Sequence, residues 1–283
     1  MKTQPGSAPA PIVVNDLSAQ YRTKGHPGGY ALRGVSFEVK AGEVLGILGE
    51  SGGGKSTLAR ILAGELARKG AGGYDIRISG GDAYVNGVAL RTISQGKRNR
   101  LTFHTAYLAQ DANDRLERTE TVAELLQQPI FARDKRFDAE AAQTRALTVL
   151  DAVGLPLAVM EKYPYELSDG QRQRVALARS LVLGPNVLIA DEPTAGIDVT
   201  VRDTVVRVIE KLREDPQFAA LVVTHDLSVL RQLGAQVAIM HDGVIVGYGD
   251  IDSVFREPDH PYVAKLARAL GLPGLDSNQE PIG

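Results

Sequence analysis

Short apolar runs alternate along the chain with longer stretches in which apolar residues recur every three or four positions. The short runs predict β-strands at residues 12–15, 35–39, 44–48, 187–190, 221–224, 237–240 and 244–247. The longer stretches have helical spacing, as in the series Leu58, Ile61, Leu62 and Leu66 and the series Val205, Val208, Ile209 and Leu212. Strands that alternate with helices are typical of a parallel sheet covered by helices, so the pattern predicts an α/β fold.

Residues 111–165 differ in composition from the segments on either side. They are rich in Ala, Glu, Gln, Leu and Arg, and their apolar residues follow helical spacing at Leu116, Val122, Leu125 and Leu126 and again at Leu147, Leu150 and Val153. We therefore expect a helical insertion in the α/β core. Glycine pairs at 72–73 and 80–81 predict a pair of strands around 76–78 and 84–85.

The two ends of the chain are rich in residues that interrupt regular structure. Residues 1–11 contain three prolines and lack the apolar stretch of a secretory signal, and the chain is again rich in Pro and Gly from about residue 271. We expect a flexible tail at 1–11, one folded domain at 12–250 and a C-terminal extension at 251–283.

The composition narrows the classes of function. Among 283 residues, 32 Lys and Arg stand against 34 Asp and Glu, and the net charge of -2 leaves no overall basic footprint for nucleic acid. The absence of Cys excludes disulfides, thiolate zinc sites and iron–sulfur ligation. No apolar run approaches the roughly 18–20 residues that span a bilayer, so we expect a soluble protein whose membrane role would come through a partner.

The strongest chemical signal is the sequence Gly-Glu-Ser-Gly-Gly-Gly-Lys-Ser at residues 49–56, which fits the phosphate-loop pattern G-x-x-x-x-G-K-[ST] between a strand and a helix. Glycines let successive backbone N–H groups point inward around phosphate oxygens, and the helix adds the positive end of its dipole. Lys55 would reach the β- and γ-phosphates, and Ser56 would ligate Mg²⁺. We assign the nucleotide contacts of this segment to Gly49, Ser51, Gly52, Gly53, Gly54, Lys55, Ser56 and Thr57.

A pair of acidic residues follows the predicted strand at 187–190. Asp191 and Glu192 stand at its carboxyl end, the edge where open α/β sheets bind ligands. Asp191 can hold Mg²⁺ through its water shell, and Glu192 can orient and deprotonate an attacking water. An Asp-Glu pair alone could equally be a solvated turn, but beside a phosphate loop it predicts nucleotide hydrolysis.

The sequence Leu-Ser-Asp-Gly-Gln at residues 167–171, followed by Arg-Gln-Arg, resembles the signature motif of the ATP-binding cassette (ABC) ATPases. Ser168 is a good N-cap for the following helix, whose N-terminal end can bind an anion. In that family this end contacts the γ-phosphate of ATP held by a second subunit, a role that falls here on Ser168, Gly170 and Gln171. The resemblance extends from about residue 12 to residue 270.

The fold that this resemblance implies is the ABC nucleotide-binding domain, at residues 12–250. It is a P-loop NTPase core of the α/β class with a mixed sheet, an antiparallel β subdomain and a helical insertion at about 111–165.

The resemblance also assigns roles to residues outside the motifs above. Tyr21 occupies the position of the aromatic residue that stacks on adenine, although an isolated Tyr near a strand can also be a surface or core residue. Gln110 matches the glutamine that contacts Mg²⁺ and the attacking water, and His225 matches the histidine that contacts the γ-phosphate. Asp198 matches the aspartate that communicates between the two sites of a dimer. The implied catalytic residues are Glu192, His225 and Gln110, and the implied Mg²⁺ ligands are Ser56, Gln110 and Asp191.

Two positions depart from the family pattern. Asp169 stands where the family has the second glycine of its signature, and a carboxylate there would repel an incoming γ-phosphate although it suits the helix dipole. Residues 195–197 read Ala-Gly-Ile where the family commonly has Ser-Ala-Leu. We therefore hypothesise that the two sites of a dimer are unequal and that this chain forms a heterodimer, with a homodimer as the alternative.

The C-terminal sequence Pro-Asp-His-Pro-Tyr-Val-Ala-Lys-Leu, at residues 258–266, is similar to an element of ATPases that serve oligopeptide, dipeptide and nickel importers. The alternative is an ordinary turn into a helix, and we interpret His260 as a turn residue and not as a metal ligand. Some of those relatives carry a Cys-rich cluster near the C-terminus, which this chain cannot form.

The importer resemblance implies a set of partners. They are a second ABC ATPase subunit, two integral-membrane permease subunits and an extracellular or periplasmic solute-binding protein, with no direct contact to nucleic acid. ATP and Mg²⁺ are the implied cofactors, and the implied location is peripheral, on the cytoplasmic face of the cell membrane. A permease helix would dock along residues 111–118 and 163–166, where Tyr163 and Tyr165 either form a contact patch or pack into the insertion.

The sequence therefore predicts an ATPase that converts ATP and water to ADP and phosphate and drives the uptake of peptides or a related small solute. Two such domains would enclose two ATP molecules, each between one phosphate loop and the opposite signature. The alternative is a non-transport ABC ATPase, such as a subunit of a carbon–phosphorus lyase complex or a nucleic-acid-associated ATPase. A GTPase is disfavoured because the chain lacks the Asn-Lys-x-Asp motif that reads guanine.

Overall fold

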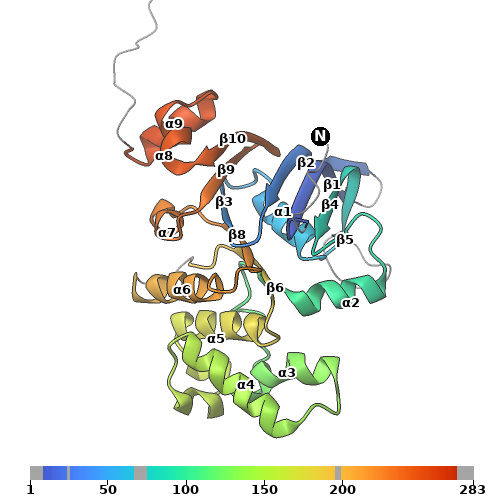
Figure 1. The fold of residues 1–283 in the computed structure, drawn as a ribbon, viewed down its shortest axis with the longest axis vertical. Helices are drawn as coiled ribbons and strands as arrows, with labels where there is room; N and C mark the ends of the chain where they lie inside the picture. The colour runs from blue at the N-terminus through green and yellow to red at the C-terminus, as the bar shows by residue number, and fades with distance from the viewer. Residues whose placement is uncertain (1–8, 24–25, 67–74, 195–198, 273–283) are drawn as a thin grey trace, which may run out of the picture.

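The computed structural model describes residues 9–23, 26–66, 75–194 and 199–272, which form two β-sheets and the helices around them (Figure 1). The larger sheet has the strand order β10-β9-β3-β8-β7-β6. Its strands are β3 (Val44–Gly49), β6 (Thr105–Leu108), β7 (Val187–Asp191), β8 (Ala219–Val223), β9 (Gln236–His241) and β10 (Val244–Asp250). All neighbours pair in parallel except β9 and β10, which are antiparallel. The predicted mixed sheet of an α/β fold is confirmed.

The smaller sheet is antiparallel and has the order β2-β1-β4-β5. Its strands are β1 (Ile12–Thr23), β2 (His26–Val39), β4 (Ile76–Val85) and β5 (Val88–Ala89). It corresponds to the predicted antiparallel β subdomain. Strands β1 and β2 are much longer than the predicted strands at 12–15 and 35–39, because the hydrogen-bonded ladder continues through polar and glycine residues beyond the apolar runs.

The expected pair of strands in residues 76–85 is wrong, because this segment is the single strand β4. Past the pairing of Asn15 with Asp82, two residues of β1 stand opposite Gly81 alone. Gly81 has a φ of 62°, and a Cβ there would lie 2.1 Å from the carbonyl oxygen of Asp16. Gly81 therefore lies opposite a β-bulge of β1, whose backbone it approaches closely, and not in a turn between two strands.

Helix α1 (Lys55–Leu62) lies between the two sheets and contacts strands of both (Figure 1). Its residues Leu58, Ile61 and Leu62 are fully buried in a cluster that also contains side chains of β1, β2 and β4 from the small sheet and of β3, β7 and β8 from the large one. The helical spacing predicted this element, although the helix ends at Leu62 and Leu66 lies beyond it. Because α1 starts at the end of the phosphate loop, its packing in the core fixes the position of that loop.

The helical insertion contains α3 (Val122–Arg133), α4 (Ala139–Ala152) and two short 3₁₀ helices (Leu157–Glu161 and Pro164–Glu166), which pack near α5 (Asp169–Leu181) at the bottom of Figure 1. Helix α3 begins where Thr121 and Glu124 form a reciprocal capping box. The turns before it include Leu116, which belongs to no helix but is buried in the core. The spacing therefore predicted the burial of Leu116 but not its conformation.

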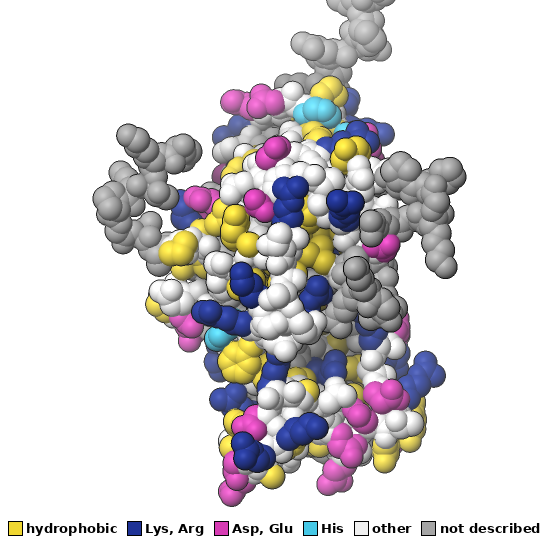
Figure 2. All heavy atoms as spheres, turned by 90° about the vertical axis from the view of Figure 1, so that its right-hand side faces the viewer, with side chains coloured by type: hydrophobic (Ala, Val, Ile, Leu, Met, Phe, Trp, Pro, Cys, Tyr) yellow, Lys and Arg dark blue, Asp and Glu magenta, His cyan; other side chains and the backbone are white. Residues whose placement is uncertain are grey.

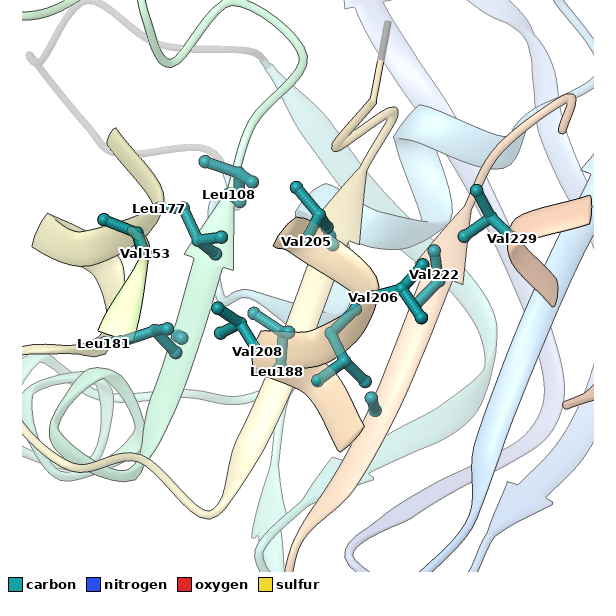
Figure 3. Packing of buried hydrophobic residues seen from close by; sticks show 14 of the residues in the cluster. Leu108, Val153, Leu177, Leu181, Leu188, Val205, Val206, Val208, Val222 and Val229 are labelled. Carbon is teal, nitrogen blue, oxygen red and sulfur yellow. The ribbon is translucent and has the colours of Figure 1, made fainter. Parts of the chain in front are cut away.

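A second buried cluster joins the large sheet to α5 and to α6 (Val199–Leu212). In Figure 3 the side chains of Leu108, Leu188 and Val222, from strands β6, β7 and β8, lie among those of the two helices. Leu177 and Leu181 come from α5, whereas Val205 and Val208 come from α6. This cluster fixes the signature helix α5 to the sheet that carries the acidic pair.

The remaining helices pack around the large sheet. They are α2 (Gln95–His104) beside β6, α7 (Leu227–Gln232) beside α6, and α8 (Ile251–Arg256) with α9 (Pro261–Ala269), which pack on each other and on β10. None of the helices formed by the described residues is long and apolar enough to cross a bilayer.

Candidate nucleotide site

The loop between β3 and α1 needs glycine at both of its ends. Gly49 has a φ of 144° and Gly54 a φ of 98°, in the region that side chains disfavour. A Cβ on Gly49 would lie 2.0 Å from the carbonyl oxygen of Met240, and one on Gly54 would lie 2.5 Å from that of Ala31. The loop therefore passes close to the backbones of β9 and β2, and only glycine fits.

The side chain of Lys55 turns back over this loop. Its Nζ donates hydrogen bonds to the carbonyl oxygens of Gly49, at 2.9 Å, and of Glu50, at 2.6 Å. Partial burial lowers the pKa of the Lys55 ammonium, although the carboxylates of Glu192, Asp191 and Glu50 oppose the shift. The ammonium is thus held at the loop, where the phosphates of a nucleotide would lie.

Ser56 and Asp191 join the start of α1 to the end of β7. The hydroxyl of Ser56 donates to Oδ1 of Asp191 at 3.1 Å. Asp191 is fully buried, its Oδ2 has no hydrogen-bond partner among the described residues, and burial raises the pKa of its carboxyl group. A hydroxyl and an unsatisfied carboxylate oxygen are hard oxygen ligands, so these residues fit Mg²⁺.

Glu192 follows Asp191 in an unusual backbone conformation. Its φ of 54° is left-handed, and its N–H donates to the carbonyl oxygen of Val223 at 2.8 Å. Its Oε2 lies 3.0 Å from Nδ1 of His225, the residue two positions past β8. The Glu192 side chain is 13% exposed and that of His225 is 76% exposed, so the carboxylate lies in the cleft and the imidazole at its mouth.

A cavity of about 650 Å³ brings most of the predicted site residues together. Its lining contains Tyr21, Gln110, Glu192, His225 and most of the phosphate loop, whereas the predicted site residues Gly53 and Asp191 lie outside it. The phenol of Tyr21 is hydrogen-bonded to the hydroxyl of Thr57 at 2.8 Å, so its ring is anchored at the start of α1. Such a cavity is large enough for a nucleotide, and its lining combines acidic, basic and aromatic side chains.

Sequence reasoning missed residues of β2 that line the same cavity. Tyr30, which is 53% exposed, lies there with Gly29 and Ala31. Tyr30 pairs with Gln20 across the hairpin, next to Tyr21. A second tyrosine on the strand that pairs with the one carrying Tyr21 was the available signal, but the predicted strands stopped short of it.

The described signature residues lie outside the lining of this cavity. Ser168 caps α5 by accepting a hydrogen bond from the Gln171 N–H at 3.2 Å, and the Ser168 N–H in turn donates to Oε1 of the Gln171 side chain at 3.0 Å. Gly170 is in the first turn of this helix, and Asp169 pairs with Arg172. The buried Nε2 of Gln173 donates to the carbonyl oxygen of Pro193 at 3.2 Å and ties the helix to the segment after Glu192, a contact that the sequence did not predict.

Asp198 and the departure at residues 195–197 lie outside the described residues. The structure therefore brings together Tyr21, the phosphate loop, Gln110, the acidic pair and His225, and it places the signature elsewhere. The individual roles of these residues remain predictions.

A parallel sheet with a phosphate loop at one strand and an acidic pair at another defines a P-loop nucleotide-hydrolysing domain. The chain matches the ABC transporter family over residues 32–195, more than half of its length, and it belongs to that family. The predicted ABC fold and the predicted class of enzyme, an ABC ATPase, are confirmed.

Two relatives indicate the subfamily. The chain is 34% identical over 241 residues to the glutathione import ATP-binding protein GsiA of Escherichia coli (strain K12), covering 85% of this chain and 37% of GsiA. It is 34% identical over 244 residues to the oligopeptide transport ATP-binding protein AmiE of Streptococcus pneumoniae serotype 4, covering 85% of this chain and 67% of AmiE. The predicted resemblance to peptide-type importers is confirmed, although the chain spans little more than a third of the length of GsiA.

Solved structures give the same family. The dimeric ATP-binding cassette MJ0796, in a post-hydrolysis state bound to ADP and Pi, aligns with a TM-score of 0.74 at 26% identity, over 85% of this chain and 98% of the cassette. The cbiO1 protein of Clostridium perfringens, part of the cbiONQ ABC transporter complex, aligns with a TM-score of 0.72 at 26% identity, over 93% and 96%.

Proposed function

We propose that this chain is the ATP-hydrolysing subunit of an importer for peptides or a related small solute, working through separate permease subunits at the cytoplasmic face of the membrane. The observation that carries the ATPase part is the arrangement of Lys55, Ser56–Asp191 and Glu192–His225 around one cavity. The importer part rests on the Pro-Asp-His-Pro-Tyr element and on the names of the two relatives.

The chemistry of this site follows from the atoms that surround it. Lys55 and the loop N–H groups bind the β- and γ-phosphates, while the Tyr21 ring lies beside the adenine. Glu192 orients water for in-line attack and takes its proton, and His225 holds the γ-phosphate. Mg²⁺ held by Ser56, Asp191 and Gln110 would neutralise charge on the phosphate oxygens.

A second ATPase subunit is part of the proposal, because the signature lies outside the cavity of its own chain. The capped N-terminal end of α5 would contact the γ-phosphate held by that subunit. Asp169 is the reason to prefer a heterodimer: its side chain is 72% exposed at that helix end, where it would face the phosphate. A dimeric solved relative supports pairing of cassettes but not the choice of partner.

A second cavity, of about 570 Å³, supports a docking place for the permease between the core and the insertion. Its lining includes Asn99 and Thr102 of α2, Gln128 of α3, and Ala112 and Leu116 from the turns before α3. The last two belong to the predicted docking segment 111–118.

The predicted tyrosine pair does not belong to the lining of that cavity. The rings of Tyr163 and Tyr165 stack on each other at 5.4 Å, and Tyr165 is 66% exposed. We therefore separate this pair from the docking cavity and keep it as a contact patch on the insertion.

Charge disfavours the alternative of a nucleic-acid-associated ATPase. Basic, acidic and hydrophobic side chains are interspersed over the face that carries β5 and α2 (Figure 2), and the net charge is -2. Proteins that bind nucleic acid present a clustered basic face instead. The lyase-complex alternative has no such argument against it and has to be separated by experiment.

The test is co-purification of the tagged chain from cells that produce it, with the Glu192→Gln variant used to hold the ATP-bound assembly. We expect integral-membrane permeases in the detergent extract, and peptide-stimulated ATPase activity when the complex is reconstituted in vesicles with its binding protein. Lys55→Ala is the control for ATP dependence. Recovery with soluble lyase subunits, and no membrane proteins, would replace the importer with the alternative.

A further inference from the structure

The side chain of Glu50 points away from the nucleotide cavity although it belongs to the phosphate loop. Gly49, Ser51 and Gly52 line the cavity, and Glu50 does not. Its Oε1 lies 2.6 Å from Nδ1 of His241, a close polar contact at the end of β9. The loop thus has an outer face, and that face touches the C-terminal half of the chain.

His241 is in turn covered by helix α9. The Tyr262 ring stacks on the His241 imidazole with centroids 4.2 Å apart and planes at 13°. The phenol of Tyr262 lies near the backbone of Glu50, and its pKa is raised by burial and by the Glu50 carboxylate. Tyr262 therefore reaches the loop both directly and through His241.

The position of Tyr262 is fixed by its own helix. His260 caps α9 by accepting the Tyr262 N–H on Nδ1 at 3.1 Å, and Pro261 occupies the first helical turn. Val263 and Ala267, on the inner side of α9, are almost fully buried in the large core cluster. The helix is therefore a rigid support and not a loose extension.

Glu50 also occupies the point where the loop closes. Its carbonyl oxygen accepts hydrogen bonds from Lys55 Nζ at 2.6 Å and from the Gly53 N–H at 3.2 Å. The neighbouring turn adds a bond from the Gly243 N–H to the Gly53 carbonyl oxygen at 3.3 Å. A shift of Glu50 would move both the lysine and the loop amides.

We propose that helix α9 positions the phosphate loop for ATP through the contacts of Tyr262 and His241 with Glu50. These three are positioning residues, since none of them lines the cavity. The inference rests on the proposed ATP site. It gives the Pro-Asp-His-Pro-Tyr element a structural role inside this chain, because Pro261 and His260 form the start of α9 and Tyr262 contacts the loop.

The test measures Mg-ATP binding to the purified full chain by titration calorimetry, with kcat and KM for ATP from the same preparations. Tyr262→Ala should raise Kd and KM at least about fivefold with kcat changed far less, the size expected for coupling between two sites. Tyr262→Phe, which keeps the ring on His241, should retain most of the affinity. Lys265→Ala, on the exposed side of α9, is the matched control and should bind like the wild type.

A double-mutant cycle separates positioning from general destabilisation. Glu50→Ala alters an exposed loop side chain, so it keeps the inference testable even if Tyr262→Ala fails to fold. We expect the effects of Tyr262→Ala and Glu50→Ala on Kd to be far from additive, because both break one contact chain. Additive effects, or wild-type affinity in both single variants, would overturn the inference. A wild-type chain that binds no Mg-ATP would overturn the proposed function instead.

Discussion

The hydroxyl of Ser56 and the carboxylate of Asp191 meet at 3.1 Å across 135 residues of sequence, and they join the helix after the phosphate loop to the strand that ends in the acidic pair. The second carboxylate oxygen is buried and has no hydrogen-bond partner within the part of the chain that the structure describes. A buried carboxylate without full pairing lowers the free energy of unfolding. We therefore infer that this pair suits a bound cation better than it suits the stability of the fold.

Replacing Asp191 by Asn should therefore stabilise the protein while it abolishes Mg²⁺-dependent ATP hydrolysis. The pKa of the Asp191 carboxyl is raised in the folded protein. Above the ordinary Asp pKa, ionising this carboxylate therefore costs free energy in the folded state but not in the unfolded chain, and the protein loses stability. Each kcal/mol relieved should raise Tm by about 2–4 °C in a domain of this size. Differential scanning calorimetry without nucleotide measures the effect.

The stability difference between the wild type and Asp191→Asn should depend on pH. Because the folded pKa is raised, the wild type gains stability as pH falls through the folded pKa, and the advantage of Asp191→Asn should shrink toward pH 4 and below. An Asn variant that is less stable than the wild type at pH 7 would show that the carboxylate is satisfied in the fold.

Glu192→Gln should bind ATP normally, accumulate as a dimer with its partner and hydrolyse ATP about 10²–10⁴-fold more slowly, the usual contribution of a general base. The amide can still orient water near His225 but cannot take a proton. Size-exclusion chromatography with ATP, followed by single-turnover assays, measures both properties. Near-normal turnover would remove Glu192 as the base.

Tyr21→Ala should weaken ATP binding by about 1–3 kcal/mol, the range for loss of an aromatic ring under a base, whereas Tyr21→Phe should keep most of the affinity. The hydrogen bond of the Tyr21 phenol to Thr57 at 2.8 Å orients the ring without contributing to the stack. Thr57→Val is the matched control for that bond. Equal losses in the Phe and Ala variants would assign the role to the hydroxyl.

Gly54→Ala should abolish nucleotide binding, because the added Cβ would lie 2.5 Å from the Ala31 carbonyl oxygen in a residue whose φ is 98°. Gly42→Ala is the matched control, with a φ of 82° and nothing within 4 Å of the added carbon. It should lose only about 1–3 kcal/mol of folding stability, the cost of the strained backbone, and still bind ATP. Chemical denaturation and calorimetry distinguish the two outcomes.

Asp169→Gly should raise the ATPase rate of the assembled complex, because in the proposed dimer it removes a carboxylate that would face the γ-phosphate of the partner's nucleotide. Asp169 pairs with Arg172, so Arg172→Ala in the same complex shows whether that pairing already neutralises the charge. An unchanged rate in Asp169→Gly would remove the basis for unequal sites.

Local sequence was sufficient for the parts of the site that are contiguous in the chain. The phosphate loop needs glycines at fixed spacing, and the acidic pair needs a buried strand before it, so both could be predicted from neighbouring residues. Strand β6 was missed because only two of its four residues, Ala106 and Leu108, are aliphatic. The single strand β4 was misjudged because a glycine pair can also lie opposite a bulge of the neighbouring strand, where the two backbones come close.

Contacts between distant segments could not be predicted in the same way. Tyr30 enters the cavity through the register of the hairpin between β1 and β2, which extends well beyond the apolar runs. Glu50, His241 and Tyr262 meet only because β9 pairs with β3 and α9 packs on β10. The sequence marked the segments that contain Glu50 and Tyr262, but it indicated no contact between them, and tertiary packing brings them together.

Helix α1 has one end in the nucleotide loop and its body between the two sheets, where Leu58, Ile61 and Leu62 are fully buried. Any ligand that orders the start of this helix will also make the melting of the whole molecule harder. At a concentration one hundred times its Kd, a nucleotide adds about 2.7 kcal/mol to the free energy of unfolding. The rise in melting temperature that each nucleotide causes in the isolated chain can therefore rank nucleotides by affinity before any permease or transported solute is known.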